Sequence, residues 1–186
     1  MENNIEEHKR KSVTINGKSN VYKYLKANFD EEQDKYNIRN GMENIDECLL
    51  DHNLQKNIIN NIFIGSTTDN KDYNLIKREL EKKIAGYKKQ DIDKKIFDNK
   101  LLISFDDLLQ KLISSKLKCY YCCDNVYVLY KNVREQKQWT LDRINNDLCH
   151  SNENTLIACL NCNLRRRLTD MEKFDFTKKL RISKVD

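Results

Sequence analysis

The sequence contains no proline, only four glycines and no apolar run of about 18 residues, the length that a helix needs to cross a bilayer. Residues 1–17 also lack the apolar core of a secretory signal, so we expect neither a membrane protein nor a secreted one. The scarcity of proline and glycine beside abundant lysine, asparagine and isoleucine is typical of an AT-rich coding sequence. A single lysine therefore says little about function.

The cysteine count excludes complete pairing into disulfides, because there are seven. In a chain that is not exported we expect these thiols to stay reduced, in an intracellular compartment. Metal binding is then the preferred explanation for the cysteines that cluster.

The length of 186 residues suits a single domain, or a small domain with helical additions. A content of 39% hydrophobic and 34% charged residues is typical of a soluble globular protein. The formal net charge of the chain is +5, and residues 164–184 alone have the same excess of positive charge, with eight basic and three acidic residues. Such a segment indicates a polyanionic partner, although a solvated helix face in a lysine-rich chain has the same composition.

The chain divides into three parts. We expect residues 1–20 to be disordered, residues 21–100 to be mainly helical, and residues 101–186 to form the functional module. Within the helical part, residues 72–89 carry apolar side chains at helical spacing, which predicts an exposed amphipathic helix. Those side chains are Leu75, Ile76, Leu80 and Ile84.

The C-terminal part is predicted to contain a helix, two strands and a second helix. Ser104 and Asp107 resemble a capping box in front of an apolar stripe. β-branched and aromatic residues predict short strands at residues 125–130 and 138–144. The pattern turns helical again after the last cysteine, with a packing face of Leu168, Met171 and Phe174.

Four cysteines form two Cys-x-x-Cys pairs, with thirty-six residues between the pairs. Four thiolates complete the tetrahedral coordination of Zn²⁺ and leave no open position, so we expect a structural zinc site. Buried free thiols and an iron–sulfur cluster are the less favoured alternatives. The expected ligands are Cys119, Cys122, Cys159 and Cys162.

The other three cysteines are expected not to bind the metal. Cys123 directly follows Cys122, so either thiol could be the second ligand, and the two-residue spacing favours Cys122. Cys149 lies in a polar loop and Cys48 is remote from both pairs.

Residues 104–167 contain the motifs "CYYC", "WTLDRINN", "CHSNENTLIAC" and "CLNCNLRRR". In order and spacing these motifs resemble the four-cysteine HNH endonucleases of the His-Me finger, or ββα-metal, class. The resemblance implies a β-hairpin packed on a helix around one catalytic cation, with zinc outside the active centre. It also implies hydrolysis of phosphodiester bonds in nucleic acid, most often double-stranded DNA, with Mg²⁺ or Mn²⁺.

The resemblance assigns roles to three residues. Asp142, at the end of the first strand, and Asn163, after the second cysteine pair, would be oxygen ligands of the catalytic Mg²⁺ or Mn²⁺. Asn154 matches the asparagine that holds the loop before the second strand.

The general base departs from the family pattern, which places a histidine directly after the aspartate. This chain has Arg143 there, and arginine cannot act as a base near neutral pH because its pKa lies above about 12. Arg143 could instead clamp the phosphate. His150, in the loop between the strands, is the candidate base, with a surface or turn contact as its alternative role; His52 beside Asp51 is a weaker candidate.

Three arginines follow the second cysteine pair and could contact nucleic-acid phosphates: Arg165, Arg166 and Arg167. Trp139, Tyr120 and Tyr121 are expected to pack around the zinc rather than to stack on bases.

The sequence thus predicts an α+β protein, with a zinc-stapled ββα-metal (His-Me finger) module at the C-terminal end after a mainly helical N-terminal region. The leading hypothesis is an HNH-type endonuclease. The alternatives are an inactive zinc module that binds nucleic acid, and a zinc-stapled structural or interaction protein.

Overall fold

The computed structural model describes residues 37–66 and 71–180; residues 1–20, expected to be disordered, lie outside this part. The described chain is α+β, as predicted. A short 3₁₀ helix, η1 (Glu47–Leu50), precedes the helices α2 (His52–Phe63), α3 (Lys71–Asp93) and α4 (Phe105–Ser114). The strands β1 (Trp139–Arg143) and β2 (Thr155–Cys159) follow, and then the helices α5 (Leu160–Arg166) and α6 (Met171–Lys179).

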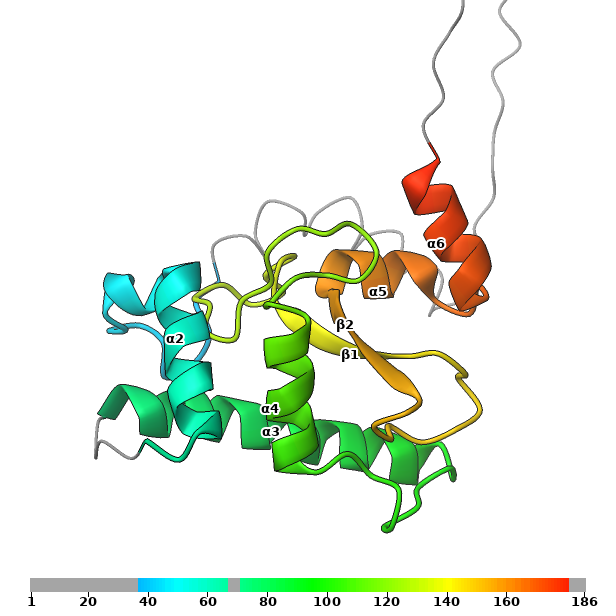
Figure 1. The fold of residues 1–186 in the computed structure, drawn as a ribbon, viewed down its shortest axis with the longest axis horizontal. Coiled ribbons are helices and arrows are strands. Elements are labelled where there is room, and N and C mark those ends of the chain that lie inside the picture. The colour runs from blue at the N-terminus through cyan, green and yellow to red at the C-terminus, as the bar shows by residue number, and fades with distance from the viewer. Residues whose placement is uncertain (1–36, 67–70, 181–186) are drawn as a thin grey trace, which may run out of the picture.

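The predicted amphipathic helix is α3, the long helix that runs along the lower edge of the molecule in Figure 1. Ile76 and Leu80 are buried, and α3 contacts both α2 and α4. Two acidic residues of α3, Glu79 and Asp91, are buried as well. The helix therefore brings carboxylates into the interior, which its periodicity did not predict.

The capped helix predicted at Ser104 is α4. The Ser104 hydroxyl oxygen accepts a hydrogen bond from the Asp107 backbone N–H at 3.1 Å, which satisfies a donor that the first helical turn leaves open. Its apolar face buries Leu108, Leu109 and Leu112 against α2, α3 and β2.

The sheet consists of β1 and β2, which pair antiparallel with Trp139 opposite Cys159 and Arg143 opposite Thr155. The strand predicted at residues 125–130 is wrong, since this segment forms only isolated bridges. The buried side chain of Gln55 takes the place of a neighbouring strand: its amide accepts from the N–H groups of Val128 and Leu129 and donates to the Leu129 carbonyl. The segment is thus held by a side chain from α2.

The C-terminal helix predicted as one piece is two helices, because the chain turns at Arg167, whose φ is 51°. Leu168 is consequently 85% exposed, so its predicted place on a packing face is wrong. Phe174 is buried on α6, with its ring centroid 4.9 Å from that of Tyr121. In Figure 1, α5 lies next to the end of β2, and α6 turns away from it.

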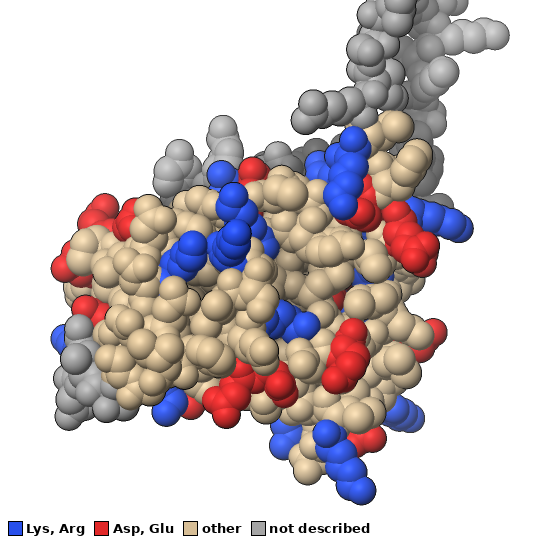
Figure 2. All heavy atoms as spheres, viewed as in Figure 1, with Lys and Arg blue, Asp and Glu red and all other residues tan. Residues whose placement is uncertain are grey.

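Within the described ranges, no helix has the length and apolar character needed to span a membrane. On the face shown in Figure 2, basic and acidic side chains are interspersed over a largely uncharged surface.

Candidate active site and cysteine cluster

The four predicted zinc ligands come together although thirty-six residues separate the two pairs. The Sγ atoms of Cys119, Cys122, Cys159 and Cys162 all lie within 4.8 Å of one another. The distance between the Sγ atoms of Cys122 and Cys159 is 3.9 Å. Four sulfurs around a tetrahedral ion with Zn–S bonds of about 2.3 Å are separated by about 3.8 Å. The cluster therefore has the size that a metal ion such as Zn²⁺ requires.

Cys122, and not Cys123, is the second member of the first pair. Cys123 is exposed, with a backbone φ of 59°, and among the described residues it is not part of the cluster. Cys48 is exposed and Cys149 is buried, and neither belongs to the cluster.

The electrostatics of the cluster favour a bound cation. A hydrogen bond from Cys159 lowers the pKa of Cys119 to about 5, so this thiol ionises easily. Burial and the charge of Cys119 raise the pKa of Cys162 to about 12. Ionisation of one thiol thus opposes ionisation of the next, and a divalent cation would remove this opposition.

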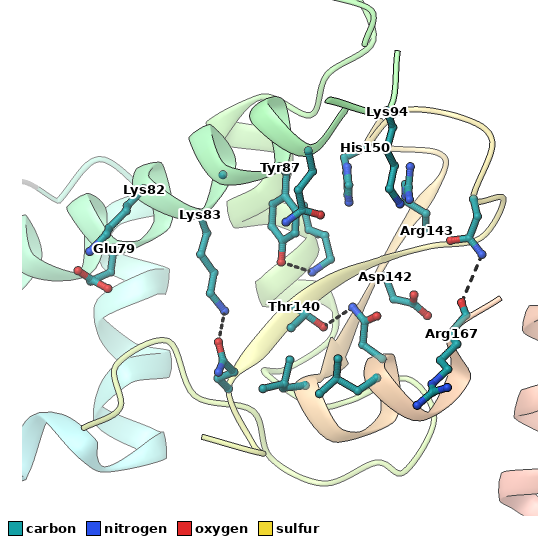
Figure 3. Close-up of a pocket in the computed structure, with 18 of the residues that line it drawn as sticks. Glu79, Lys82, Lys83, Tyr87, Lys94, Thr140, Asp142, Arg143, His150 and Arg167 are labelled. Atoms are coloured by element: carbon teal, nitrogen blue, oxygen red, sulfur yellow. Dashed lines mark hydrogen bonds between the residues drawn. The ribbon is translucent and has the colours of Figure 1, made fainter. Parts of the chain in front are cut away.

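A cavity of about 630 Å³ lies between α3, β1 and α5. One face of α3 lines its long wall, with Glu79, Lys83, Tyr87 and Gln90 at helical spacing. Figure 3 shows this wall of α3 together with the labelled side chains that β1 and the neighbouring loops contribute to the same cavity. The wall residues include Thr140, Asp142, Arg143, Asn146, His150, Asn163 and Arg167.

Asp142 is 4% exposed and contributes to the cavity wall from the end of β1. Its Oδ2 accepts a hydrogen bond from the Tyr121 hydroxyl at 2.6 Å, and its Oδ1 accepts one from Arg166 Nη1 at 2.8 Å. Burial raises the pKa of Asp142, while the Tyr121 hydrogen bond and the Arg166 charge oppose this shift. Each oxygen keeps a further lone pair after these contacts.

Asn163, on α5, lines the same cavity. Its Nδ2 donates a hydrogen bond to the Thr140 hydroxyl oxygen at 3.0 Å, and that hydroxyl in turn donates to the Ala158 carbonyl. Because Nδ2 is the donor, the other end of the amide is the acceptor oxygen Oδ1, and no described residue donates to it. The structure thus brings the two predicted oxygen ligands to one cavity.

Arg143 is buried at the cavity wall rather than extended into solvent. Its Nη1 donates to the Leu148 carbonyl at 3.1 Å and lies 3.7 Å from Asp91 Oδ1. These contacts hold the guanidinium beside the loop that joins the two strands.

His150 is 3% exposed, so its alternative role as a surface residue is wrong. Its Nδ1 lies 2.7 Å from Asp91 Oδ1, and its ring centroid lies 4.6 Å from that of Tyr87. His52, by contrast, lies outside the cavity, with its Nε2 3.1 Å from the Leu117 carbonyl.

Asn154 fixes the loop between the strands through its whole side-chain amide. Its Oδ1 accepts from the Asn145 backbone N–H, and its Nδ2 donates to the carbonyls of Asn145 and Cys149, all three at 2.9 Å. The loop that carries His150 is therefore tied at both ends.

The three arginines after the second cysteine pair differ in their surroundings. Arg165 and Arg167 are exposed, and Arg167 lines the cavity. Arg166 is 1% exposed and donates to Asp142 and to the carbonyls of Arg143 and Ile144. The prediction that Arg166 meets phosphates is wrong, because its guanidinium is enclosed and holds the end of β1.

The aromatic residues near the cysteine cluster also divide. Trp139 and Tyr121 are buried, whereas Tyr120 is 44% exposed and contacts Tyr121 edge-on. Tyr121 has a further contact, its hydrogen bond to Asp142, which connects the first cysteine pair with the cavity.

Sequence reasoning missed what α3 contributes to the site. The Tyr87 hydroxyl oxygen accepts a hydrogen bond from the Leu141 backbone N–H of β1 at 2.9 Å, and Asp91 binds His150. One signal was present: Asp91 continues the apolar positions Leu80, Ile84 and Tyr87 at spacings of four, three and four. An acidic residue on that stripe indicates a buried carboxylate with a specific partner.

Comparison with known proteins adds no assignment to this geometry. The chain matches no family model, and neither the curated proteins nor the solved structures gave a match.

Proposed function

We propose that this chain is a metal-dependent endonuclease of the HNH type, which hydrolyses phosphodiester bonds in DNA. The observation that carries the proposal is the convergence of Asp142 and Asn163 on one cavity together with basic side chains. A structural cysteine cluster alone requires neither of these oxygen donors.

The donor set suits a hard divalent cation. Asp142 and Asn163 would hold Mg²⁺ or Mn²⁺ through a carboxylate and an amide oxygen, both of which these ions accept. Such a cation neutralises charge at a phosphate and stabilises the leaving oxygen. Thr140 orients the Asn163 amide, and Arg166 favours the charged form of the Asp142 carboxylate.

The basic side chains of the cavity suit a polyanion. Lys82, Lys94 and Arg167 are exposed and line the cavity at different points along it. Each phosphate contact of this kind releases counterions, so binding should weaken steeply with salt. Arg143, held by Leu148 and Asp91, is positioned for a phosphate that enters the cavity.

Zinc in the cysteine cluster would act outside this chemistry. Four thiolates leave a tetrahedral ion no open position for substrate. The cluster joins the turn after α4 to the end of β2 and the start of α5, and so supports the elements that carry Asp142 and Asn163.

The test is cleavage of supercoiled plasmid by the purified protein with Mg²⁺ or Mn²⁺. Asp142→Asn keeps the size of the side chain, so that Arg166 retains an acceptor, and it should reduce cleavage at least about 100-fold. Asn163→Ala should also reduce it. The matched control is Asp147→Asn, an exposed aspartate in the neighbouring loop, which should cleave at the unaltered rate.

The outcomes separate the three hypotheses. Cleavage by Asp142→Asn at the unaltered rate would refute the assignment of Asp142 to the catalytic site. Salt-dependent DNA binding without cleavage would indicate an inactive binding module, and absence of binding at low salt would indicate a structural or interaction protein.

A further inference from the structure

We propose that Asp91 of α3 and His150 form a dyad that supplies the general base for this hydrolysis. His150 is the catalytic residue, and Asp91 is the positioning residue that acts through it. The inference rests on the proposed function, and it supplies the base that Arg143 cannot provide from β1.

The dyad is built from two hydrogen bonds to one carboxylate. Asp91 is fully buried; its Oδ1 lies 2.7 Å from His150 Nδ1, and its Oδ2 accepts from the His150 backbone N–H at 2.8 Å. An ionised carboxylate only accepts hydrogen bonds, so Nδ1 carries the hydrogen and Nε2 keeps its lone pair. No atom of residues 37–66 or 71–180 forms a hydrogen bond with Nε2. The free nitrogen is thus the one that can take a proton.

The imidazole belongs to the wall of the cavity that Asp142 and Asn163 also line. In Figure 3, His150 lies near Lys94 and Arg143, and Asp142 lies on β1, next to Arg143 in the chain. The Tyr87 ring packs against the imidazole, at a centroid distance of 4.6 Å. Asp91 is not part of the cavity lining, so it acts from behind the histidine.

The chemical step needs only water and the phosphodiester. Nε2 of His150 takes a proton from a water molecule while the water oxygen forms a bond to phosphorus. The bond from phosphorus to the leaving ester oxygen breaks, and that oxygen takes a proton from solvent. The products are a phosphomonoester end and a hydroxyl end, and the imidazolium, stabilised by Asp91, returns its proton to solvent.

The charged groups that face His150 are Asp91 and Lys94 from α3 and Arg143 from β1. Burial lowers the pKa of His150 below its ordinary value; Asp91 opposes this shift, and Arg143 and Lys94 add to it. The imidazole is therefore neutral near neutral pH, the form that a base requires.

The first test measures plasmid cleavage with Mg²⁺ as a function of pH for the unaltered protein and three variants. His150→Ala should cleave about 100-fold more slowly or worse, and added imidazole should restore part of the rate. Asp91→Asn should also be slower, since an amide can donate to Nδ1 and so select the wrong tautomer. His52→Ala, the matched histidine outside the cavity, should cleave like the unaltered protein.

The second test distinguishes positioning from a structural role. Removal of the Asp91 carboxylate removes the group that raises the pKa of His150, so the acidic limb of the pH–rate profile should move to lower pH in Asp91→Asn. The histidine resonance that disappears in His150→Ala should show the same shift in an NMR titration without Mg²⁺. A destabilised Asp91→Asn with both titrations unchanged would make Asp91 purely structural and overturn the dyad.

Cleavage by His150→Ala at the unaltered rate would overturn the dyad alone, provided that Asp142→Asn remains inactive. Failure of the unaltered protein to cleave with Mg²⁺ or Mn²⁺ would overturn the proposed function, and the base with it.

Discussion

Replacing Arg166 by alanine should destabilise the protein, whereas replacing its neighbour Arg165 should not. Arg166 is 1% exposed and donates three hydrogen bonds, to Asp142 and to the carbonyls of Arg143 and Ile144. Its loss leaves the Asp142 carboxylate buried without its cation and two carbonyls without a donor. Breaking a buried ion pair in this way costs about 3 to 5 kcal/mol. Arg165 is exposed, and its loss should change stability by less than about 0.5 kcal/mol.

Urea and thermal unfolding of both variants measure this difference. For a chain of this size a loss of 3 to 5 kcal/mol lowers the melting temperature by about 6 to 20 °C. Under the proposed function, Arg165→Ala should weaken DNA binding more directly than Arg166→Ala, because of these two arginines Arg165 is exposed and Arg166 is buried. Equal melting temperatures for Arg166→Ala and Arg165→Ala would refute the assignment of Arg166 to the interior.

Three further perturbations follow from the surroundings of Cys122, Lys83 and Gln55. Cys122→Ser should lower the metal content and stability of the purified protein and Cys123→Ser should not, as elemental analysis and thermal unfolding can check, because only Cys122 belongs to the cluster. Burial lowers the pKa of Lys83 from its ordinary value of 10.5 to about 7. Between these two pH values the Lys83 amine is protonated in the unfolded state but not in the folded state, so the free energy of unfolding rises with pH. Lys83→Met should flatten that rise, as urea unfolding at several pH values can measure. Gln55→Leu leaves four buried backbone groups without their partner and should cost about 3 kcal/mol or more in urea unfolding, while Asn57→Leu, exposed on the same helix, should cost little.

Local patterns predicted those elements whose cause is local. The cap at Ser104 satisfies a donor three residues away, and the stripe containing Ile76 and Leu80 lies along a single helix, so neighbouring residues contain the necessary information. The strand prediction at residues 125–130 was wrong because the N–H groups of Val128 and Leu129 bind the side chain of Gln55 instead of a neighbouring strand. Gln55 lies about seventy residues earlier, so no pattern within the segment indicates this contact. The prediction of one continuous C-terminal helix was wrong at Arg167, where the backbone φ is 51°. No glycine or proline near this position indicates the turn.

The spacing of the cysteines was sufficient to predict the cluster, since two Cys-x-x-Cys pairs must meet to complete four-fold coordination. The same motifs put Asp142 and Asn163 forward as oxygen donors. By itself, then, the sequence determined the identity and order of the four cysteines that form the cluster.

Only the tertiary structure decided what surrounds those groups. Asp91 lies 59 positions from His150, and Arg166 lies 24 positions from Asp142, yet each pair is joined by a buried hydrogen bond. The sequence could not show which of Arg165, Arg166 and Arg167 is buried. The three side chains have the same chemistry and differ only in which face of α5, or of the turn after it, they project from. Burial and ion pairing arise from packing between distant segments, and in this protein they separate a structural arginine from exposed ones and give a loop histidine its carboxylate.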